Sequence, residues 1–199
     1  MLDLSDYPKT IQLNDGRELV VRLLGPSDEK PLLEFMLSLP PEERIRFRHD
    51  VTDPAVIREW THNVDLKNVV PLVAVQQDEI AANWTLHFKE HGWTRHHSNI
   101  RGIVKPSFRG HGLATYMVHE LLSIAGQLDV ENVLIQLVET QKRELKKYKE
   151  VGFEVAAVLK DWVKDLKGRH HDMVILSMKL EPAWRKMERM ILDYGTHGG

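Results

Sequence analysis

The sequence predicts a single mixed α/β domain with a central, mostly antiparallel sheet flanked by helices. Two kinds of pattern predict this class. Short segments with apolar residues at every second position indicate strands. Other segments repeat their apolar residues every three to four positions, which indicates amphipathic helices. The segments follow in the order strand, helices, three strands, helix, strand, helix, two strands, which requires only one strand–helix–strand crossover near the centre of the sheet.

The N-terminal part is expected to begin with a strand at 18–24, which a Gly-Pro pair ends. Ser27 is then expected to cap a first helix, because its hydroxyl can accept a hydrogen bond from the first turn. A shorter helical stretch follows at 42–47. Asp53 and Pro54 predict the start of a third helix, with the aspartate as N-cap and the proline in the first turn.

The middle of the chain changes from helical to strand periodicity. Three strands are predicted at Val69–Gln76, 80–90 and 96–105, and the short turns between them indicate an antiparallel meander. A helix at 113–124 follows directly. The nearly continuous apolar run at 133–138 predicts a central strand that is buried on both faces.

The C-terminal part is predicted to contain a helix over Lys142–Val151 and two strands, 153–163 and 172–180, which a turn at Gly168 joins. A last amphipathic helix is expected at 183–192. We therefore expect residues 1–180 to form one domain and residues 181–199 to form a C-terminal helix and tail.

The composition excludes several classes of function. The chain has 199 residues, a formal net charge of −2 and no cysteine. The absence of cysteine excludes disulfides, thiolate nucleophiles and cysteine zinc sites. The charge is not that of a nucleic-acid-binding protein. No apolar run is long enough to span a bilayer and no signal peptide is recognised, so the sequence predicts a cytoplasmic protein without a nucleic-acid or membrane partner.

A glycine-rich turn lies between the strand at 96–105 and the helix at 113–124. The first amides of a helix have no partner within the helix, and glycines let an anion approach the backbone closely. No Lys-Ser or Lys-Thr pair follows the glycines, so this is not a P-loop. A dinucleotide loop would need glycine where Thr115 stands, although Asp129 and Glu131 lie at a suitable distance for a ribose contact.

Three motifs resemble those of the GNAT superfamily of N-acetyltransferases. The segment 109–114, RGHGLA, resembles its R/Q-x-x-G-x-G/A pyrophosphate loop, and 148–153, YKEVGF, resembles its Y-x-x-x-G-F signature. The segment 170–172, HHD, is similar to the start of its last strand, with histidine in place of tyrosine. The order of the predicted elements also resembles the GNAT acyl-CoA N-acyltransferase fold, whose central sheet is twisted.

The resemblance implies acetyl-CoA as co-substrate. In the superfamily the strand before the loop separates from the next strand at a bulge, and the pantetheine arm enters this gap. The implied cofactor-binding residues comprise the main chain of the strand end, the loop with the start of its helix, and one glutamine where many members have asparagine. They are Gly102, Ile103, Val104, Arg109, Gly110, His111, Gly112, Leu113, Ala114, Thr115 and Gln141.

The resemblance also implies direct attack of an amine on the thioester. Tyr148 matches the usual general acid, and the amide near Val104 the oxyanion donor. The usual base falls close to Ser98, which cannot accept a proton in this role, so His96, which has the same strand parity, is the candidate base. Glu139 and bulk water are alternatives. A non-catalytic acyl-CoA sensor and an NAD(P)-dependent oxidoreductase remain alternative functions.

Several other features have ordinary explanations. Adjacent residues of a strand point to opposite faces, so 170–172 is not expected to hold a metal, and no metal site is predicted. The stripe of Trp184, Met187 and Ile191 is interpreted as a core or dimer contact, which leaves a homodimer open. The segment 37–48 resembles bacterial protein-lysine acetyltransferases. Small amines, polyamines, antibiotics and peptide N-termini remain open as acceptors.

Overall fold

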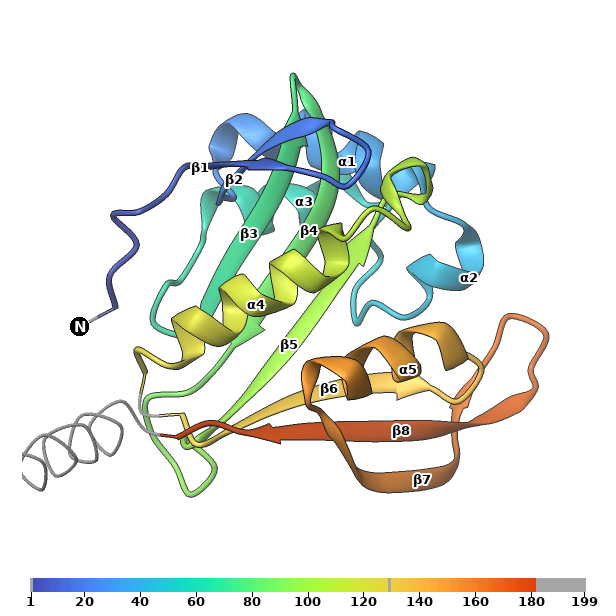
Figure 1. Ribbon diagram of the computed structural model, residues 1–199. Helices are drawn as coiled ribbons and strands as arrows, with labels where there is room; N and C mark the ends of the chain where they lie inside the picture. The colour runs from blue at the N-terminus through green and yellow to red at the C-terminus, as the bar shows by residue number, and fades with distance from the viewer. Residues whose placement is uncertain (1, 129, 182–199) are drawn as a thin grey trace, which may run out of the picture.

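The computed structural model describes residues 2–128 and 130–181 and contains one eight-stranded sheet (Figure 1). The strand order is β1-β2-β3-β4-β5-β6-β8-β7. Every neighbouring pair is antiparallel except β5 and β6, which are parallel. The predicted mixed α/β class, with a mostly antiparallel sheet and one central crossover, is therefore confirmed.

The bounds of the elements agree with most of the predicted segments. The strands are β1 (Lys9–Gln12), β2 (Glu18–Leu23), β3 (Val69–Gln76), β4 (Glu79–His87), β5 (His97–Val104), β6 (Asn132–Val138), β7 (Glu154–Lys164) and β8 (His170–Lys179). The helices are α1 (Glu29–Ser38), α2 (Pro41–Arg44), α3 (Pro54–His62), α4 (Leu113–Ala125) and α5 (Lys142–Val151), with 3₁₀ turns at Pro26–Asp28 and Pro106–Phe108. The predicted helix at 183–192, with Trp184, Met187 and Ile191, lies outside the described residues.

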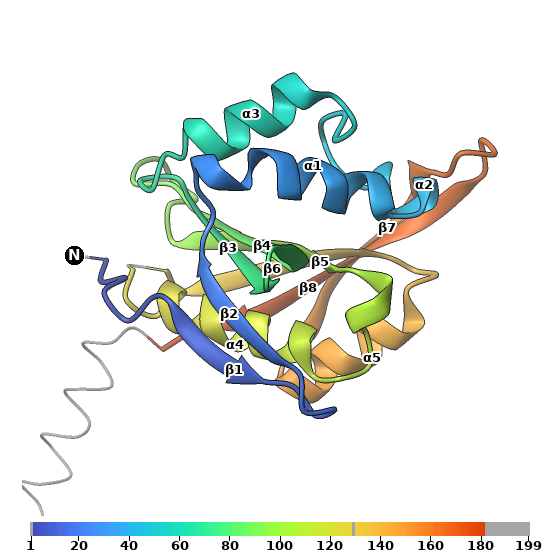
Figure 2. The ribbon, with the colours of Figure 1, turned by 90° about the horizontal axis from the view of Figure 1, so that it is seen from above.

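The helices form two layers, one on each face of the sheet. Figure 2 shows α1 and α3 on one face and α4 and α5 on the other. The core is divided accordingly: α4 packs on the sheet through Leu113, Met117 and Leu121, whereas Phe35 of α1 and Ile57 of α3 fill the opposite side. No helix within the described ranges combines the length and apolarity needed to cross a bilayer.

The prediction that the strand at 133–138 is buried on both faces is wrong. Burial alternates along β6, with Val133 and Ile135 buried and Gln136 exposed. The cause is the position of α1 and α3, which lie behind β3 and β4 and leave this face of β6 uncovered (Figure 1). The strand with burial on both faces is β3, where every residue from Val70 to Val75 is buried.

Two helix starts show how local chemistry decided the element bounds. The carboxylate of Asp53 accepts a hydrogen bond from the Ala55 amide, which confirms the predicted cap of α3. Ser27 does not cap α1, because a 3₁₀ turn delays the helix and Asp28 is its N-cap. The Asp28 side chain is buried and pairs with Arg22 at 2.7 Å instead.

The two central strands separate along their length. β5 and β6 pair only at three positions, from His97–Asn132 to Asn99–Leu134. Beyond Asn99, β5 still pairs with β4 as far as Val104, and β6 still pairs with β8 as far as Val138. The sheet therefore opens into a V between the C-terminal ends of β5 and β6 (Figure 1), and α4 begins beside this opening.

Candidate active site

The glycine-rich turn takes the backbone from β5 into the first turn of α4. Gly110 and Gly112 have φ values of 89° and 90°, a left-handed conformation that favours glycine. Gly112 is the N-cap of α4, and Leu113, Ala114 and Thr115 form its first turn. The Leu113 side chain is buried in the core. The sequence therefore places a glycine-built helix N-terminus, which suits an oxyanion such as a diphosphate, at the mouth of the V.

The side chain of Arg109 braces this turn. Its Nε donates to the Val104 carbonyl at 2.9 Å, and its two terminal nitrogens donate to the Glu43 carboxylate at 2.9 and 2.5 Å. Because the guanidinium is occupied by these partners, its role in the described structure is to hold the loop against the end of β5 and against α2. The main chain of Arg109 is free of this bracing role.

The turn between β1 and β2 packs on the loop from the other side, a contact that sequence reasoning missed. The Asn14 amide donates to the His111 carbonyl at 3.3 Å, and His111 Nδ1 lies 3.2 Å from the Asp15 carboxylate. Arg17 stacks on the Phe108 ring at 4.3 Å and donates to the Ser107 carbonyl. The four-residue strand β1 is too short to give a period, which is why this hairpin was not predicted.

The main chain of β5 faces the gap at alternate residues. The Lys105 amide donates to the Ala81 carbonyl at 2.8 Å, and the register between β4 and β5 is unbroken from Ala82–Val104 onward. In such a ladder the hydrogen-bonded pairs alternate, so the N–H and C=O groups of Gly102 and Val104 point away from β4 and toward β6. Those of Ile103 point back to β4, so among the three predicted residues this one does not present its main chain to the gap.

The bulge that the resemblance implied in β5 is absent between Asn99 and Val104. The strands separate because β5 remains paired with β4 and β6 remains paired with β8. The β4–β5 pair contains no extra residue. As a result the side chains of β5 keep their alternation. Ile100 and Val104 pack with the α4 core, whereas Ile103 packs with the core under α1 and α3.

Gly102 makes room for a buried tryptophan. A Cβ at this position would lie 2.0 Å from Cδ2 of Trp84, whose side chain is buried. Gly102→Ala is therefore expected to destabilise the fold by about 1–3 kcal/mol, as overpacking does, and thermal unfolding measures the loss. Gly25→Ala is the control, because a Cβ there meets nothing within 4 Å. An unchanged Tm for Gly102→Ala would show that the tryptophan moves aside without cost.

Tyr148 lies on α5 and is half-buried, with its ring 6.0 Å from that of Phe153 in an edge-on arrangement. Burial, and to a smaller extent the nearby Glu144, raises the pKa of the Tyr148 phenol above its ordinary value. The hydroxyl therefore stays protonated at neutral pH, as a proton donor must. Gln141 is the N-cap of α5, and its side-chain oxygen accepts a hydrogen bond from the Val138 amide at 3.0 Å.

The residues considered as a base lie in different places. Ser98 is fully buried, and its hydroxyl has no hydrogen-bond partner among the described residues. His96 precedes β5 at the closed end of the V, where its carbonyl accepts from the amides of Glu131 and Asn132 and its ring lies 4.2 Å from that of His97. Glu139 follows β6 at the open end.

Comparison with known proteins identifies the family to which this chain belongs. The model of the acetyltransferase (GNAT) family matches residues 33–153, which is more than half of the chain. The chain belongs to the GNAT family of acetyltransferases. A search of the curated proteins finds no match for this GNAT chain.

Solved structures agree on the fold of the GNAT chain. The GNAT domain of S. lividans PAT has a TM-score of 0.69 at 16% identity, over 89% of this chain and 99% of that one. Ribosomal-protein-alanine N-acetyltransferase from Brucella melitensis has a TM-score of 0.70 at 20% identity, over 80% and 99%. yncA from Salmonella typhimurium, solved with its cofactor acetyl-CoA, has a TM-score of 0.69 at 15% identity, over 82% and 94%. The family and these structures support acetyl transfer as the general chemistry.

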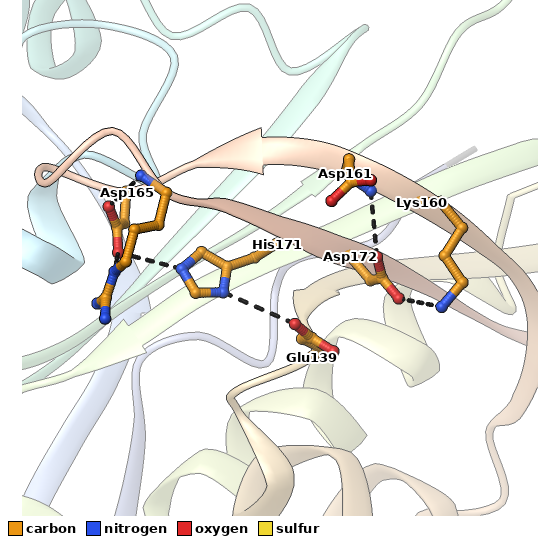
Figure 3. A network of polar contacts seen from close by, with 7 residues as sticks. Glu139, Lys160, Asp161, Asp165, His171 and Asp172 are labelled. Atoms are coloured by element: carbon orange, nitrogen blue, oxygen red, sulfur yellow. Dashed lines mark hydrogen bonds and ion pairs between the residues drawn. The ribbon is translucent and has the colours of Figure 1, made fainter.

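A polar network joins the open end of β6 to the β7–β8 hairpin of the GNAT chain (Figure 3). His171 lies between Asp165, at 3.1 Å from Nε2, and Glu139, at 3.7 Å from Nδ1. The hydrogen bond from His171, together with those from Arg169 and the Lys167 amide, holds the pKa of Asp165 well below its usual range. The network keeps Glu139 close to an imidazole that has a carboxylate on its other side.

A second part of the network lies beside the first. Asp172 accepts hydrogen bonds from Lys160 and from the Asp161 amide (Figure 3). No group of three or more histidine, aspartate or glutamate side chains is arranged to hold a metal within the described ranges. In this GNAT chain His171 and Asp172 of the 170–172 motif connect β8 to the turn at Asp165 and to β7.

Proposed function

We propose that this chain is an N-acetyltransferase that moves the acetyl group of acetyl-CoA to a primary amine by direct attack. The observation that carries the proposal is the V between β5 and β6, with the glycine-built N-terminus of α4 at its mouth. A thioester arm fits such a gap, because the main-chain groups of Gly102 and the amide of Val104 point into it along one edge, whereas the Val104 carbonyl is bonded to Arg109. The amides of the loop and of the first turn of α4 offer donors for the diphosphate.

The chemistry requires three roles from the chain. The amine nitrogen attacks the thioester carbonyl carbon, the oxygen becomes an oxyanion, and the carbon–sulfur bond then breaks. The Val104 amide is the proposed oxyanion donor. Tyr148 is the proposed acid, which gives its proton to the departing thiolate and regains one from the nitrogen of the tetrahedral intermediate. The excess proton of the ammonium is lost to Glu139 beside His171 or to water. His96 could take the proton only through water, because it precedes β5 at the closed end of the V, whereas Val104 ends this strand.

Binding of acetyl-CoA is the first expected result. At a hundredfold excess over its Kd, the co-substrate should stabilise the fold by about 2.7 kcal/mol. For a chain of this size that corresponds to a rise in Tm of roughly 5–11 °C. NAD(P) at the same concentration is the control ligand and should leave the Tm unchanged. A shift with NAD(P) and none with acetyl-CoA would overturn the assignment of the loop.

One observation favours a second candidate, a non-catalytic acyl-CoA sensor. The superfamily's usual base position is occupied by Ser98, which is buried and cannot accept the proton. Both candidates bind acetyl-CoA, but only the enzyme releases free thiol. A coupled thiol-release assay across a panel of amines therefore separates them, and a bound co-substrate without thiol release for any amine would favour the sensor.

A further inference from the structure

A row of polar side chains lies on the sheet face opposite α4, next to the V. The register pairs His87 with Asn99 and Thr85 with Arg101, and directly paired residues project to the same face. Thr85 Oγ1 is 2.9 Å from His87 Nε2. The alternate residues of these strands, such as Leu86 and Ile100, belong to the α4 core, so the polar row faces the other side.

Positive charge gathers at this row, where Arg101 projects from β5 and the exposed Arg48 is near enough to act on it electrostatically. Arg101 is half-buried, and burial together with the positive charge of Arg48 lowers its pKa. Burial and the same two arginines lower the pKa of His87 to about 4, so this imidazole is neutral at physiological pH. Within the described part of the chain, no carboxylate forms an ion pair or a hydrogen bond with the side chain of Arg48 or Arg101.

A further donor on the same face is also without a partner. Asn83 pairs with Ile103 in the β4–β5 register and is buried, and its Nδ2 has no hydrogen-bond partner among the described residues. A buried donor without a partner costs free energy, and a partly buried cation without a counter-ion costs more. The excess of donors and positive charge in one place is therefore suited to an anionic ligand.

The position of the row relates this anion to the reaction. Arg101 lies two residues beyond Asn99, the last β5 residue that pairs with β6, and directly before Gly102, whose main chain faces the gap. A group bound by Arg101 lies beside the gap on the side opposite α4. With the thioester in the gap, as the proposed function has it, an acceptor held there has its amine close to the reacting carbonyl.

We infer that the acceptor is an amine that also carries a carboxylate, which Arg48 and Arg101 bind so that the amino group faces the β5–β6 gap. The inference rests on the proposed function for the reaction, but the anion site rests on the residues alone. An arginine binds a carboxylate through two parallel hydrogen bonds, which orients the ligand as well as holding it. Free amino acids and short peptides with a free C-terminus both present this chemistry.

The test compares each acid with its own amide. Thiol release is measured for a panel of amino acids and dipeptides, each paired with its C-terminal carboxamide, using the wild type, Arg101→Gln, Arg48→Gln and the control Arg46→Gln. Arg46 is an exposed arginine of the same segment as Arg48. The wild type should prefer the acid over the amide by roughly 10–150-fold in kcat/KM, the value of a charged hydrogen bond.

Arg101→Gln should remove this preference by raising the KM of the acids, with the KM of acetyl-CoA unchanged. Arg48→Gln should reduce the preference, Arg101→Lys should restore part of it, and Arg46→Gln should behave as the wild type. Preference for dipeptides over free amino acids would identify the peptide as the source of the carboxylate. Equal use of acids and amides by the wild type, or an equal loss of both in Arg101→Gln, would overturn the inference.

A binding measurement separates this inference from the proposed function. Calorimetry with N-acetyl amino acids and their amides, in the presence of CoA, reports the anion site without turnover. If no amine releases thiol but the acids bind and Arg101→Gln abolishes that binding, the transferase proposal fails and the anion site stands. If amides are acetylated and no acid binds, the reaction stands and the anion site fails.

Discussion

Gly112→Glu is expected to abolish acetyl-CoA binding. The substitution places a carboxylate at the N-terminus of α4, where the proposed diphosphate site lies, so two anions compete for the same donors. It also forces a residue with a side chain to a φ of 90°. Calorimetric titration with acetyl-CoA measures the effect, and the expected outcome is no detectable heat of binding.

The control for backbone strain is Gly92→Glu. Gly92 has a φ of 94°, and a Cβ there meets nothing within 4 Å. It lies in the turn between β4 and β5, at the closed end of the V. The two variants therefore share the conformational cost and the added charge, but only one has its carboxylate at the helix N-terminus. Retained affinity in Gly112→Glu would show that the diphosphate does not bind at this turn.

Tyr148→Phe is expected to lower kcat by roughly 10²–10⁴-fold, the usual contribution of a general acid. The ring contact with Phe153 remains, so the fold and the Kd of acetyl-CoA should change little. In the wild type the raised pKa of the phenol keeps the acid protonated as the pH increases. Because the acid form is lost only above that raised pKa, the rate should not fall through phenol ionisation below about pH 10.

Tyr7→Phe is the matched control for loss of a phenol hydroxyl. Tyr7 donates at 2.6 Å to Glu120 in the second half of α4, and the pKa of Tyr7 is also raised by burial. Its removal should leave kcat unchanged. An unchanged kcat in Tyr148→Phe would show that this tyrosine only packs against its neighbours and that solvent protonates the thiolate.

The course of the chain could be predicted well because its local signals agree with one another. Asp53 with Pro54 marks the start of α3, and the helical period over Lys142–Val151 matches α5 to the residue. What could not be predicted depended on neighbours distant in the sequence. Whether β6 is covered on one face or on both is decided by where α1 and α3 pack (Figure 1), and its apolar run does not encode that position.

The candidate site divides in the same way. The glycine-rich turn was predictable, because positive φ values at Gly110 and Gly112 need glycine wherever the loop lies. The bracing of Arg109 by Glu43 joins residues 66 positions apart, and no local pattern predicts it. The polar row on β4 and β5 was detectable in principle, because Asn83, Thr85 and His87 alternate with apolar residues. That Arg101 lies opposite Thr85 could be known only from the register between β4 and β5.

The three-position pairing between β5 and β6 also has a mechanical consequence. It divides the sheet into two parts, one from β1 to β5 and the other from β6 to β7, which are paired to each other only near the closed end of the V. Each part is held together by its own interstrand hydrogen bonds. The distance between β5 and β6 at the open end of the V therefore depends on the packing of α4 and α5 and on whatever lies between the two strands. A ligand that hydrogen-bonds to both β5 and β6 would replace the interstrand bonds that these strands do not make. It would stiffen the sheet in the region where β5 and β6 are not paired.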